Sequence, residues 1–209
     1  MDDKKNMKLW DSIPDIRKYS SVAAMLLELK EIFTNMAELS PVIKHFPIVA
    51  DVDDTLLNGS LAAKGVLPCD PVVSFVLWAA LKGWPIVVIT ARPESGRVWT
   101  EKQLATLNIV PEALYMRPSP YTDPGPWKRR ARKEIAEMYD RKILLSIGDQ
   151  PWDVTSHDDP CPVLDKVELV GAKRAEWLLD NAPVLVRRPD AVTSLGVLVS
   201  RDACPLDST

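Results

Sequence analysis

Three short apolar runs, separated by segments with helical periodicity, set the strongest limit on the fold of this chain. The runs are PIVA, PIVVIT and KILLSIG, at residues 47–50, 85–90 and 142–148. Between and after them the sequence predicts helices over about 70–82, 94–107 and 126–139, and a short strand at 113–116. Strands that alternate with helices of this length are typical of a parallel sheet covered by helices on both faces. We therefore expect an α/β fold with a central parallel sheet.

The two ends of the chain are predicted to complete the domain around this sheet. The stretch from about Met7 to Leu39 is helix-rich, with apolar residues at helical spacing. We expect residues 1–40 to form an N-terminal helical segment that packs on a core formed by residues 41–209. The tail after Asp165 combines apolar runs with a helix-like segment, and we expect it to complete the edge of the domain.

Composition narrows the class of protein without indicating an activity. A chain of 209 residues supports one well-packed core, and a net charge of -3 argues against a general binder of nucleic acid or anionic membranes. No apolar run is long enough to cross a bilayer, and residues 1–10 lack the apolar stretch of a secretory signal. The odd count of three distant cysteines, without a CxxC pair, favours reduced thiols. We expect a cytoplasmic or otherwise intracellular protein with no membrane partner.

Three of the predicted strands end in polar residues that suit phosphate chemistry. These residues are Asp51, Thr90 and Asp149. Because ligands of parallel sheets bind at the carboxyl ends of the strands, we expect these side chains to share one rim. Asp51 could attack phosphorus as a nucleophile, and Asp53, two residues further on, could donate and accept the proton. Clustered carboxylates are costly unless a hard cation lies among them, which indicates Mg²⁺.

A lysine that offsets the charge of an incoming phosphate is also needed. Lys128 shares one helical stripe with Ala131, Ile135 and Met138. Residues at this spacing lie on the same side of a helix, so the stem of Lys128 is expected to face the core.

Four segments, taken in order, resemble the signature motifs of the haloacid dehalogenase superfamily. They are VADVDDTLLNG, IVVITARPE, PWKRRARKEI and LLSIGDQPWDV, within residues 47–155. The resemblance implies a three-layer, Rossmann-like fold. It also implies that Asp51 is the nucleophile and a metal ligand, and that Asp53 is the general acid and base and binds the metal through its backbone carbonyl. Thr90 would hold the phosphoryl oxygens, and Lys128 would neutralise them.

The same resemblance implies further residues that bind the metal and residues that bind the substrate. Asp149 would bind Mg²⁺ as the cofactor, and Asp153 would be a second acidic residue that supports the metal. Thr55 and Arg92 would be supporting residues at the rim, where the substrate binds.

The amino-acid sequences of the motifs resemble one branch of this superfamily more than the others. ITARPE, KRRARKEI and the tail APVLVRRPDAVTSLGVLVS are similar to class B and related (subfamily III) acid phosphatases. The stretches between the motifs hold little more than core elements, so a cap domain is expected to be absent or minimal. The resemblance therefore implies that residues 41–209 form a haloacid dehalogenase-like phosphatase core. We expect it to hydrolyse phosphate monoesters with Mg²⁺, through an aspartyl-phosphate on Asp51.

Several alternatives stay open at this point. The aspartyl-phosphate could pass to an acceptor other than water, which would make the protein a phosphotransferase. A catalytically inactive binding protein could also keep this fold, although every core motif residue is present. The phosphorylated substrate could be a nucleotide, a phosphoprotein or the end of a nucleic acid, and the N-terminal helices could form a homo-oligomer. Loops that bind nucleotides through GxxxxGK[ST] or GxGxxG do not occur in the sequence.

Residues that flank the motifs have more ordinary interpretations. Asp54, the third acidic residue of the first motif, is predicted to be a turn residue. A basic run beside Lys128 is more typical of a solvated helix face than of a docking surface for a polyanion; it comprises Arg129, Arg130, Arg132 and Lys133. Four aromatic residues near the motifs are expected to be buried, although one or two could stack on a ring or base; they are Trp99, Tyr121, Trp127 and Trp152. Of the two histidines, only His157 follows a motif closely.

Overall fold

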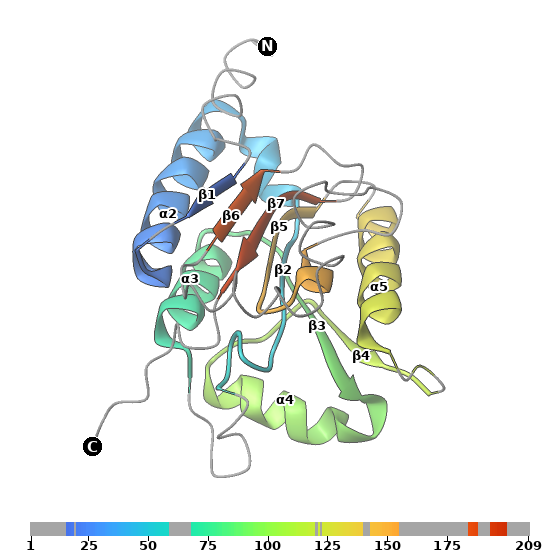
Figure 1. The fold of residues 1–209 in the computed structure, drawn as a ribbon. Helices are drawn as coiled ribbons and strands as arrows, with labels where there is room; N and C mark the ends of the chain where they lie inside the picture. Colours follow the sequence, from blue (N-terminus) through green and yellow to red (C-terminus); the bar gives the residue numbers. More distant parts are fainter. Residues whose placement is uncertain are drawn as a thin grey trace, which may run out of the picture.

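Strands and helices alternate through the part of the chain that the computed structural model describes (Figure 1). The described residues are 16–18, 20–58, 68–119, 121, 123–139, 143–154, 184–187 and 193–199. The strands are β1 (Ile16–Lys18), β2 (Ile48–Ala50), β3 (Ile86–Pro93), β4 (Ala113–Arg117), β5 (Ile143–Gly148), β6 (Val184–Arg187) and β7 (Thr193–Leu198). The helices are α2 (Val22–Leu39), α3 (Asp70–Leu81), α4 (Arg97–Thr106) and α5 (Pro124–Met138), with the 3-10 helices η1 (Pro41–His45), η3 (Glu94–Gly96) and η4 (Pro151–Asp153).

The strands form one sheet in the order β1-β6-β7-β5-β2-β3-β4. From β7 to β4 all neighbouring strands are parallel, whereas β6 and β1 add an antiparallel edge. The chain runs outward from β2 to β3 and β4, and then returns to β5 on the other side of β2. The carboxyl ends of β2 and β5 therefore meet at a topological switch point, where sheets of this kind bind ligands.

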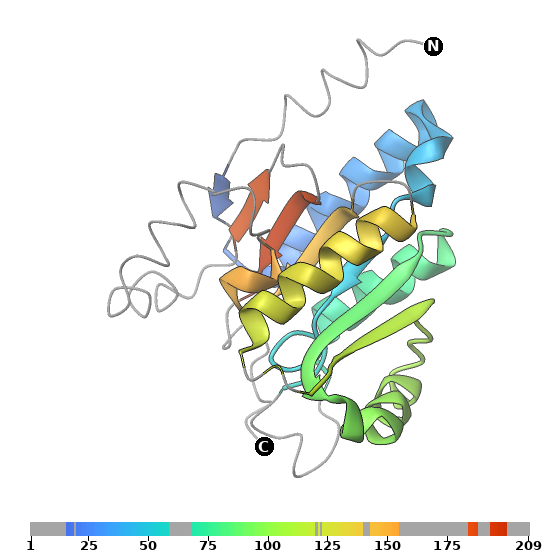
Figure 2. The same ribbon diagram turned by 90° about the vertical axis from the view of Figure 1, so that its right-hand side faces the viewer.

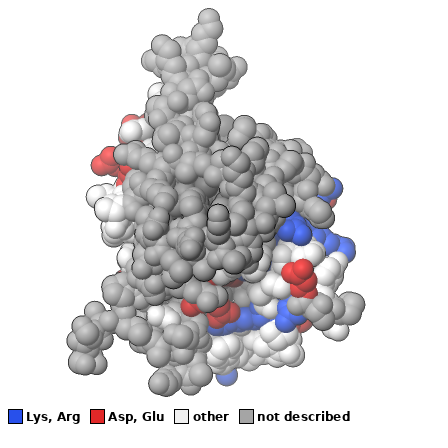
Figure 3. All heavy atoms as spheres, viewed as in Figure 1, with Lys and Arg blue, Asp and Glu red and all other residues white. Residues whose placement is uncertain are grey.

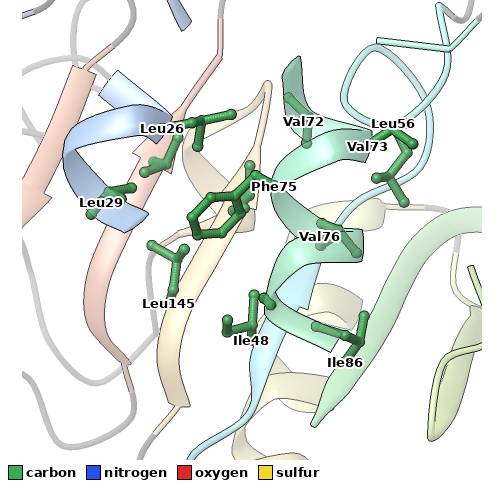
Figure 4. Close-up of a cluster of buried hydrophobic side chains, with 14 of the residues drawn as sticks. Leu26, Leu29, Ile48, Leu56, Val72, Val73, Phe75, Val76, Ile86 and Leu145 are labelled. Atoms are coloured by element: carbon green, nitrogen blue, oxygen red, sulfur yellow. The ribbon is translucent and has the colours of Figure 1, made fainter. Parts of the chain in front are cut away.

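Helices cover both faces of the sheet, so the predicted three-layer α/β fold is confirmed. In Figure 2, α5 lies in front of the strands, and α2 and α3 lie behind them. The larger apolar core lies under α2 and α3, and includes Leu29, Phe75, Ile48 and Leu145 (Figure 4). A smaller core lies under α5 and joins Ala131 and Ile135 to the opposite face of β2, β3 and β5. Parallel strands buried on both faces explain why the strand sequences are continuously apolar.

Local signals account for where the helices begin. The Ser21 hydroxyl caps α2 by accepting a hydrogen bond from the Ala24 amide at 3.1 Å. The Asp123 carboxylate caps α5 by accepting one from the Gly125 amide at 2.8 Å, and Pro124 lies in the first turn. Helix α5 therefore begins at Pro124, two residues before the predicted start at 126, because the capping residue lies further upstream than the sequence pattern indicated.

The prediction that residues 7–39 are helix-rich is correct for α2 and wrong for Ile16–Lys18. Those three residues form β1, which pairs antiparallel with β6. The strand that they pair with lies far away in the sequence, so local periodicity carries no signal for it. Residues 1–15 lie outside the described residues, as do the first apolar run of the tail, VELV at 167–170, and its helix-like segment, AKRAEWLLD at 172–180.

The oxidation state of Cys69 also differs from the prediction of reduced thiols. Cys69, directly before α3, is fully buried and takes part in a disulfide. Its partner lies outside the described residues. Reduced thiols were predicted because the cysteines are distant in sequence, but sequence distance does not limit distance in a fold that brings remote segments together.

None of the helices in the described ranges is both long enough and apolar enough to cross a membrane.

Replacement of Phe75 by alanine is expected to lower the free energy of unfolding by about 3–5 kcal/mol. Phe75 is fully buried, and its ring centroid lies 6.1 Å from that of Phe33 and 5.6 Å from that of Trp78. Leu81, on the same helix but 88% exposed, provides the matched control, and Leu81→Ala should change stability by less than about 0.5 kcal/mol. Urea denaturation followed by circular dichroism measures both. Equal losses in the two variants would contradict the described packing of α3.

Candidate active site

Three of the predicted site residues lie at the carboxyl ends of adjacent strands. Asp51 directly follows β2, and its amide donates a hydrogen bond to the Ile147 carbonyl of β5 at 3.0 Å. Asp149 directly follows β5, and Thr90 lies in β3 on the other side of β2. All three side chains are buried. The structure therefore brings Asp51, Thr90 and Asp149 to one rim, as predicted.

The chain turns sharply after Asp51. The amides of Leu56 and Leu57 both donate to the Val52 carbonyl at 2.9 Å. Asp54 has a φ of 58°, in the left-handed region that aspartate tolerates, which agrees with its prediction as a turn residue. Thr55, predicted at the rim, is fully buried inside this turn. Its hydroxyl has no hydrogen-bond partner among the described residues.

Lys128 reaches the rim from the first turns of α5. Its ammonium group lies 2.6 Å from Asp51 Oδ1 and 2.6 Å from Asp153 Oδ1, and the residue is only 2% exposed. Ala131 and Ile135, on the same side of α5, are buried, so the prediction that this side of the helix and the stem of Lys128 face the core is confirmed. Met138 was predicted on the same side but is 65% exposed. A buried ammonium needs paired carboxylates, and here it has two.

Asp153 reaches this position through a tight turn after β5. Its amide donates to the Gln150 carbonyl at 2.9 Å, and its Oδ2 accepts from the Gln150 amide at 2.9 Å. The turn packs directly on Gly148, where an added Cβ would lie 2.1 Å from Asp153 Cβ. Only glycine leaves room for this approach. Gly148 is thus a residue of the site that sequence reasoning missed, although its place directly before Asp149 was visible in the motif.

Three aspartates form a group that could hold a metal ion. Oxygen atoms of Asp51, Asp149 and Asp153 all lie within 4.8 Å of one another, and the three residues are buried. Carboxylate oxygens are hard donors that suit Mg²⁺. Lys128 forms ion pairs with two of the three, Asp51 and Asp153, and the three carboxylates together form a donor set that fits a divalent cation. The carbonyl of Asp53 as a fourth ligand stays a prediction.

Burial perturbs the acid–base behaviour of this group. Burial, aided by the charges of Asp153 and Asp149, raises the pKa of Asp51 well above its usual range, although Lys128 opposes the shift. Burial likewise raises the pKa of Asp149 to about 6, and the charge of Asp153 adds to the effect. Burial by itself would lower the pKa of Lys128, but the carboxylates of Asp51 and Asp153 outweigh it and raise the pKa. A bound cation would favour the ionised aspartates.

Asp53 and Arg92 form a second pair beside this group. Arg92 donates from Nη2 and Nε to the two carboxylate oxygens of Asp53, at 2.7 and 2.9 Å. Its Nη1 donates to Gln103 Oε1 at 2.6 Å and to Thr100 Oγ1 at 3.2 Å, both on α4. Arg92 is 8% exposed, and its two hydrogen bonds orient Asp53; its role in substrate binding stays a prediction. Sequence reasoning missed Thr100 and Gln103, since buried polar residues on a helix carry no distinctive spacing.

The flanking residues divide between core and surface. Within the basic run, Arg130 and Lys133 are exposed as predicted, whereas Arg132 is only 1% exposed, so the prediction of a solvated face is wrong for it. The exposed basic side chains gather near α5 in Figure 3. Trp127 is buried against Tyr121, with ring centroids 5.8 Å apart, while Trp99 is 49% exposed. His157 lies outside the described residues.

Comparison with known proteins supports the fold. No protein-family model and no curated protein matches the sequence. The structure is similar to a class C acid phosphatase from Bacillus anthracis with tungstate bound, with a TM-score of 0.51 and 20% identity over 84% of this chain and 80% of that chain. The resemblance predicted from the sequence is therefore confirmed as a fold shared with an acid phosphatase.

Two further solved structures match a smaller part of the chain. They are described as the Pnkp1/Rnl/Hen1 complex and the Pnkp1/Rnl/Hen1 RNA repair complex, each 24% identical over 52% of this chain, with TM-scores of 0.43 and 0.42. The match spans 40% and 37% of the length of those chains.

Replacement of Gly148 by alanine is expected to displace Asp153 and to lower the free energy of unfolding by about 1–3 kcal/mol, since the new methyl group overlaps the Asp153 side chain. Binding of Mg²⁺, followed by calorimetric titration, should weaken in the same variant. Gly96→Ala provides the control because nothing lies within 4 Å of its added Cβ. If Gly148→Ala bound Mg²⁺ as tightly as Gly96→Ala, Asp153 would not belong to the metal site.

Affinity for Mg²⁺ is expected to fall about tenfold between pH 7 and pH 5. Protons and the metal compete for the same oxygens, and Asp149 takes up a proton as the pH falls through its pKa of about 6. The raised pKa of Asp51 acts in the same direction. Calorimetric titration of Mg²⁺ at pH 5, 6 and 7 measures the change. An affinity that did not vary over this range would exclude Asp149 as a ligand.

Proposed function

We propose that this protein is a Mg²⁺-dependent phosphatase that hydrolyses phosphate monoesters through an aspartyl-phosphate on Asp51. The observation that carries the proposal is the contact of Asp51 with Lys128, 2.6 Å apart, beside two further aspartates that could complete a metal site. A carboxylate held in this way has its charge balanced and its direction set, as an attacking group requires. The fold shared with an acid phosphatase is consistent with this chemistry.

In the first step a carboxylate oxygen of Asp51 forms a bond to phosphorus as the bond to the leaving oxygen breaks. Asp53 donates a proton to that oxygen, which leaves as an alcohol. One carboxyl oxygen of Asp53 can carry this proton while the other still accepts a hydrogen bond from Arg92, so the pair need not separate. Lys128 and Thr90 would bind the phosphoryl oxygens.

In the second step water attacks the phosphorus of the aspartyl-phosphate and gives its proton to Asp53. The bond between phosphorus and Asp51 breaks, and inorganic phosphate leaves. Mg²⁺ held by Asp51, Asp149 and Asp153 would supply positive charge to the phosphoryl oxygens in both steps. An acceptor alcohol in place of water would give phosphotransfer by the same route.

The cellular location stays a prediction. An intracellular protein was expected from the sequence, but the disulfide at Cys69 is unusual for a reducing compartment.

Phosphate release from p-nitrophenyl phosphate with Mg²⁺ tests the proposal. Asp51→Asn keeps the shape of the side chain but removes the nucleophile, and is expected to abolish turnover, as should a chelator. Asp53→Asn should lower kcat by about 100-fold or more, because the leaving group loses its proton donor. Glu38→Gln, an exposed carboxylate on α2, is the matched control and should leave turnover unchanged.

Two results would contradict the proposal. Unchanged turnover in Asp51→Asn would exclude this residue as the nucleophile. Turnover that persisted in the chelator would exclude the metal. Addition of glycerol as an acceptor separates hydrolysis from transfer, because transfer would form a new phosphoester in place of inorganic phosphate.

A further inference from the structure

Trp99 presents an aromatic surface next to the proposed site. It lies in the first turn of α4 and is 49% exposed, unlike Trp84 and Trp127, which are buried. The guanidinium carbon of Arg92 lies 4.4 Å from the centroid of its ring, a cation–π contact. An exposed tryptophan alone needs no explanation, but this one touches the residue that holds Asp53.

The contact fixes the ring in place. The Arg92 guanidinium donates hydrogen bonds from all three of its nitrogens, to Asp53, Thr100 and Gln103. A guanidinium held on several sides has one orientation, so the indole that packs against it is held as well. Arg92 covers part of the indole, and 49% of the residue is still exposed. The result is a rigid, flat and partly open surface one side chain away from Asp53.

We propose that Trp99 stacks on the base of a phosphorylated nucleoside, which makes nucleoside phosphates the substrate class of this site. The inference rests on the proposed phosphatase function. Asp53 would donate its proton to the leaving oxygen, so the leaving group would lie next to Asp53. Arg92 contacts Asp53, and Trp99 contacts Arg92. A nucleoside has a sugar between its phosphate and its planar base. Similarly, one side chain, that of Arg92, connects the proposed proton donor Asp53 to the indole ring.

The same geometry disfavours a phosphotyrosine peptide. In phosphotyrosine the ring is bonded directly to the ester oxygen, so it would lie beside Asp53 and not beyond Arg92. The charges nearby also favour stacking over binding of a phosphate backbone. Arg97, adjacent to the rim on α4, is paired with Glu94 and Glu101. Stacking on an aromatic ring tolerates any base, so the proposal names no base.

The test compares two substrates that both release a secondary alcohol, adenosine 3′-phosphate and glycerol 2-phosphate. In Trp99→Leu the ratio of kcat/KM for the nucleotide to that for glycerol phosphate should fall about tenfold or more, and Trp99→Phe should retain most of the ratio. Using the ratio cancels any general effect that acts through Arg92 and Asp53. Val98→Ala, the neighbouring residue and 65% exposed, is the matched control and should leave the ratio unchanged.

Additional substrates identify the source of the nucleoside phosphate. Adenosine 5′-phosphate and a 3′-phosphorylated oligonucleotide are assayed in the same way. A loss confined to mononucleotides supports free nucleotides as substrates, and a loss confined to the oligonucleotide supports nucleic-acid ends. A ratio unaffected by Trp99→Leu for every nucleoside phosphate would overturn the proposal. A loss seen only with a phosphotyrosine peptide would also overturn it.

Binding without turnover separates this inference from the proposed function. Equilibrium dialysis of adenosine 3′-phosphate onto Asp51→Asn protein, with and without Trp99→Leu, measures the same contact when hydrolysis is blocked. Weaker binding in the double variant supports stacking, and equal binding overturns it. If the wild-type protein released no phosphate from any substrate, the proposed function would fail, while the dialysis would still decide the role of Trp99.

Discussion

The buried ion pair between Lys128 and two aspartates is the interaction on which the site depends. Lys128 is almost completely removed from water, and each of its carboxylate partners lies 2.6 Å away. Because an unpaired buried charge is strongly unfavourable, these groups constrain one another. Apolar packing of Ala131 and Ile135 sets the orientation of α5, and that orientation delivers Lys128 to the strand ends. The apolar core and the charged site are therefore parts of one arrangement.

The carboxylates around Lys128 carry more negative charge than it balances. Asp51, Asp149 and Asp153 come from two neighbouring strand ends and the turn that follows β5. Burial of this group raises the pKa of Asp51 and Asp149, and the like charges of the neighbouring carboxylates add to the effect, so keeping the group ionised is costly. A divalent cation would remove that cost. Binding of a metal ion and ionisation of Asp51 would therefore favour each other, and Gly148 provides the space that makes the third carboxylate available.

Arg92 connects this charged centre to the surface. It extends from the end of β3, holds Asp53 through two hydrogen bonds, and is itself held by side chains of α4. Its guanidinium also contacts the indole of Trp99. A single guanidinium thus orients a proposed proton donor and fixes a partly exposed ring beside it. Arg92, predicted to touch the substrate, thus also positions the residues around it through its hydrogen bonds to Asp53, Thr100 and Gln103.

The sequence by itself determined the strand–helix alternation, the parallel sheet and the strand-end residues Asp51, Thr90 and Asp149, because these follow from local periodicity and from a general rule about parallel sheets. The inward-facing stem of Lys128 followed from helical spacing in the same way. Only the tertiary structure decided the pairing of β1 with β6, the Cys69 disulfide, the burial of Arg132 and the contacts of Arg92. Each of these joins segments that are remote in sequence or depends on the close approach of side chains, and no local pattern encodes either.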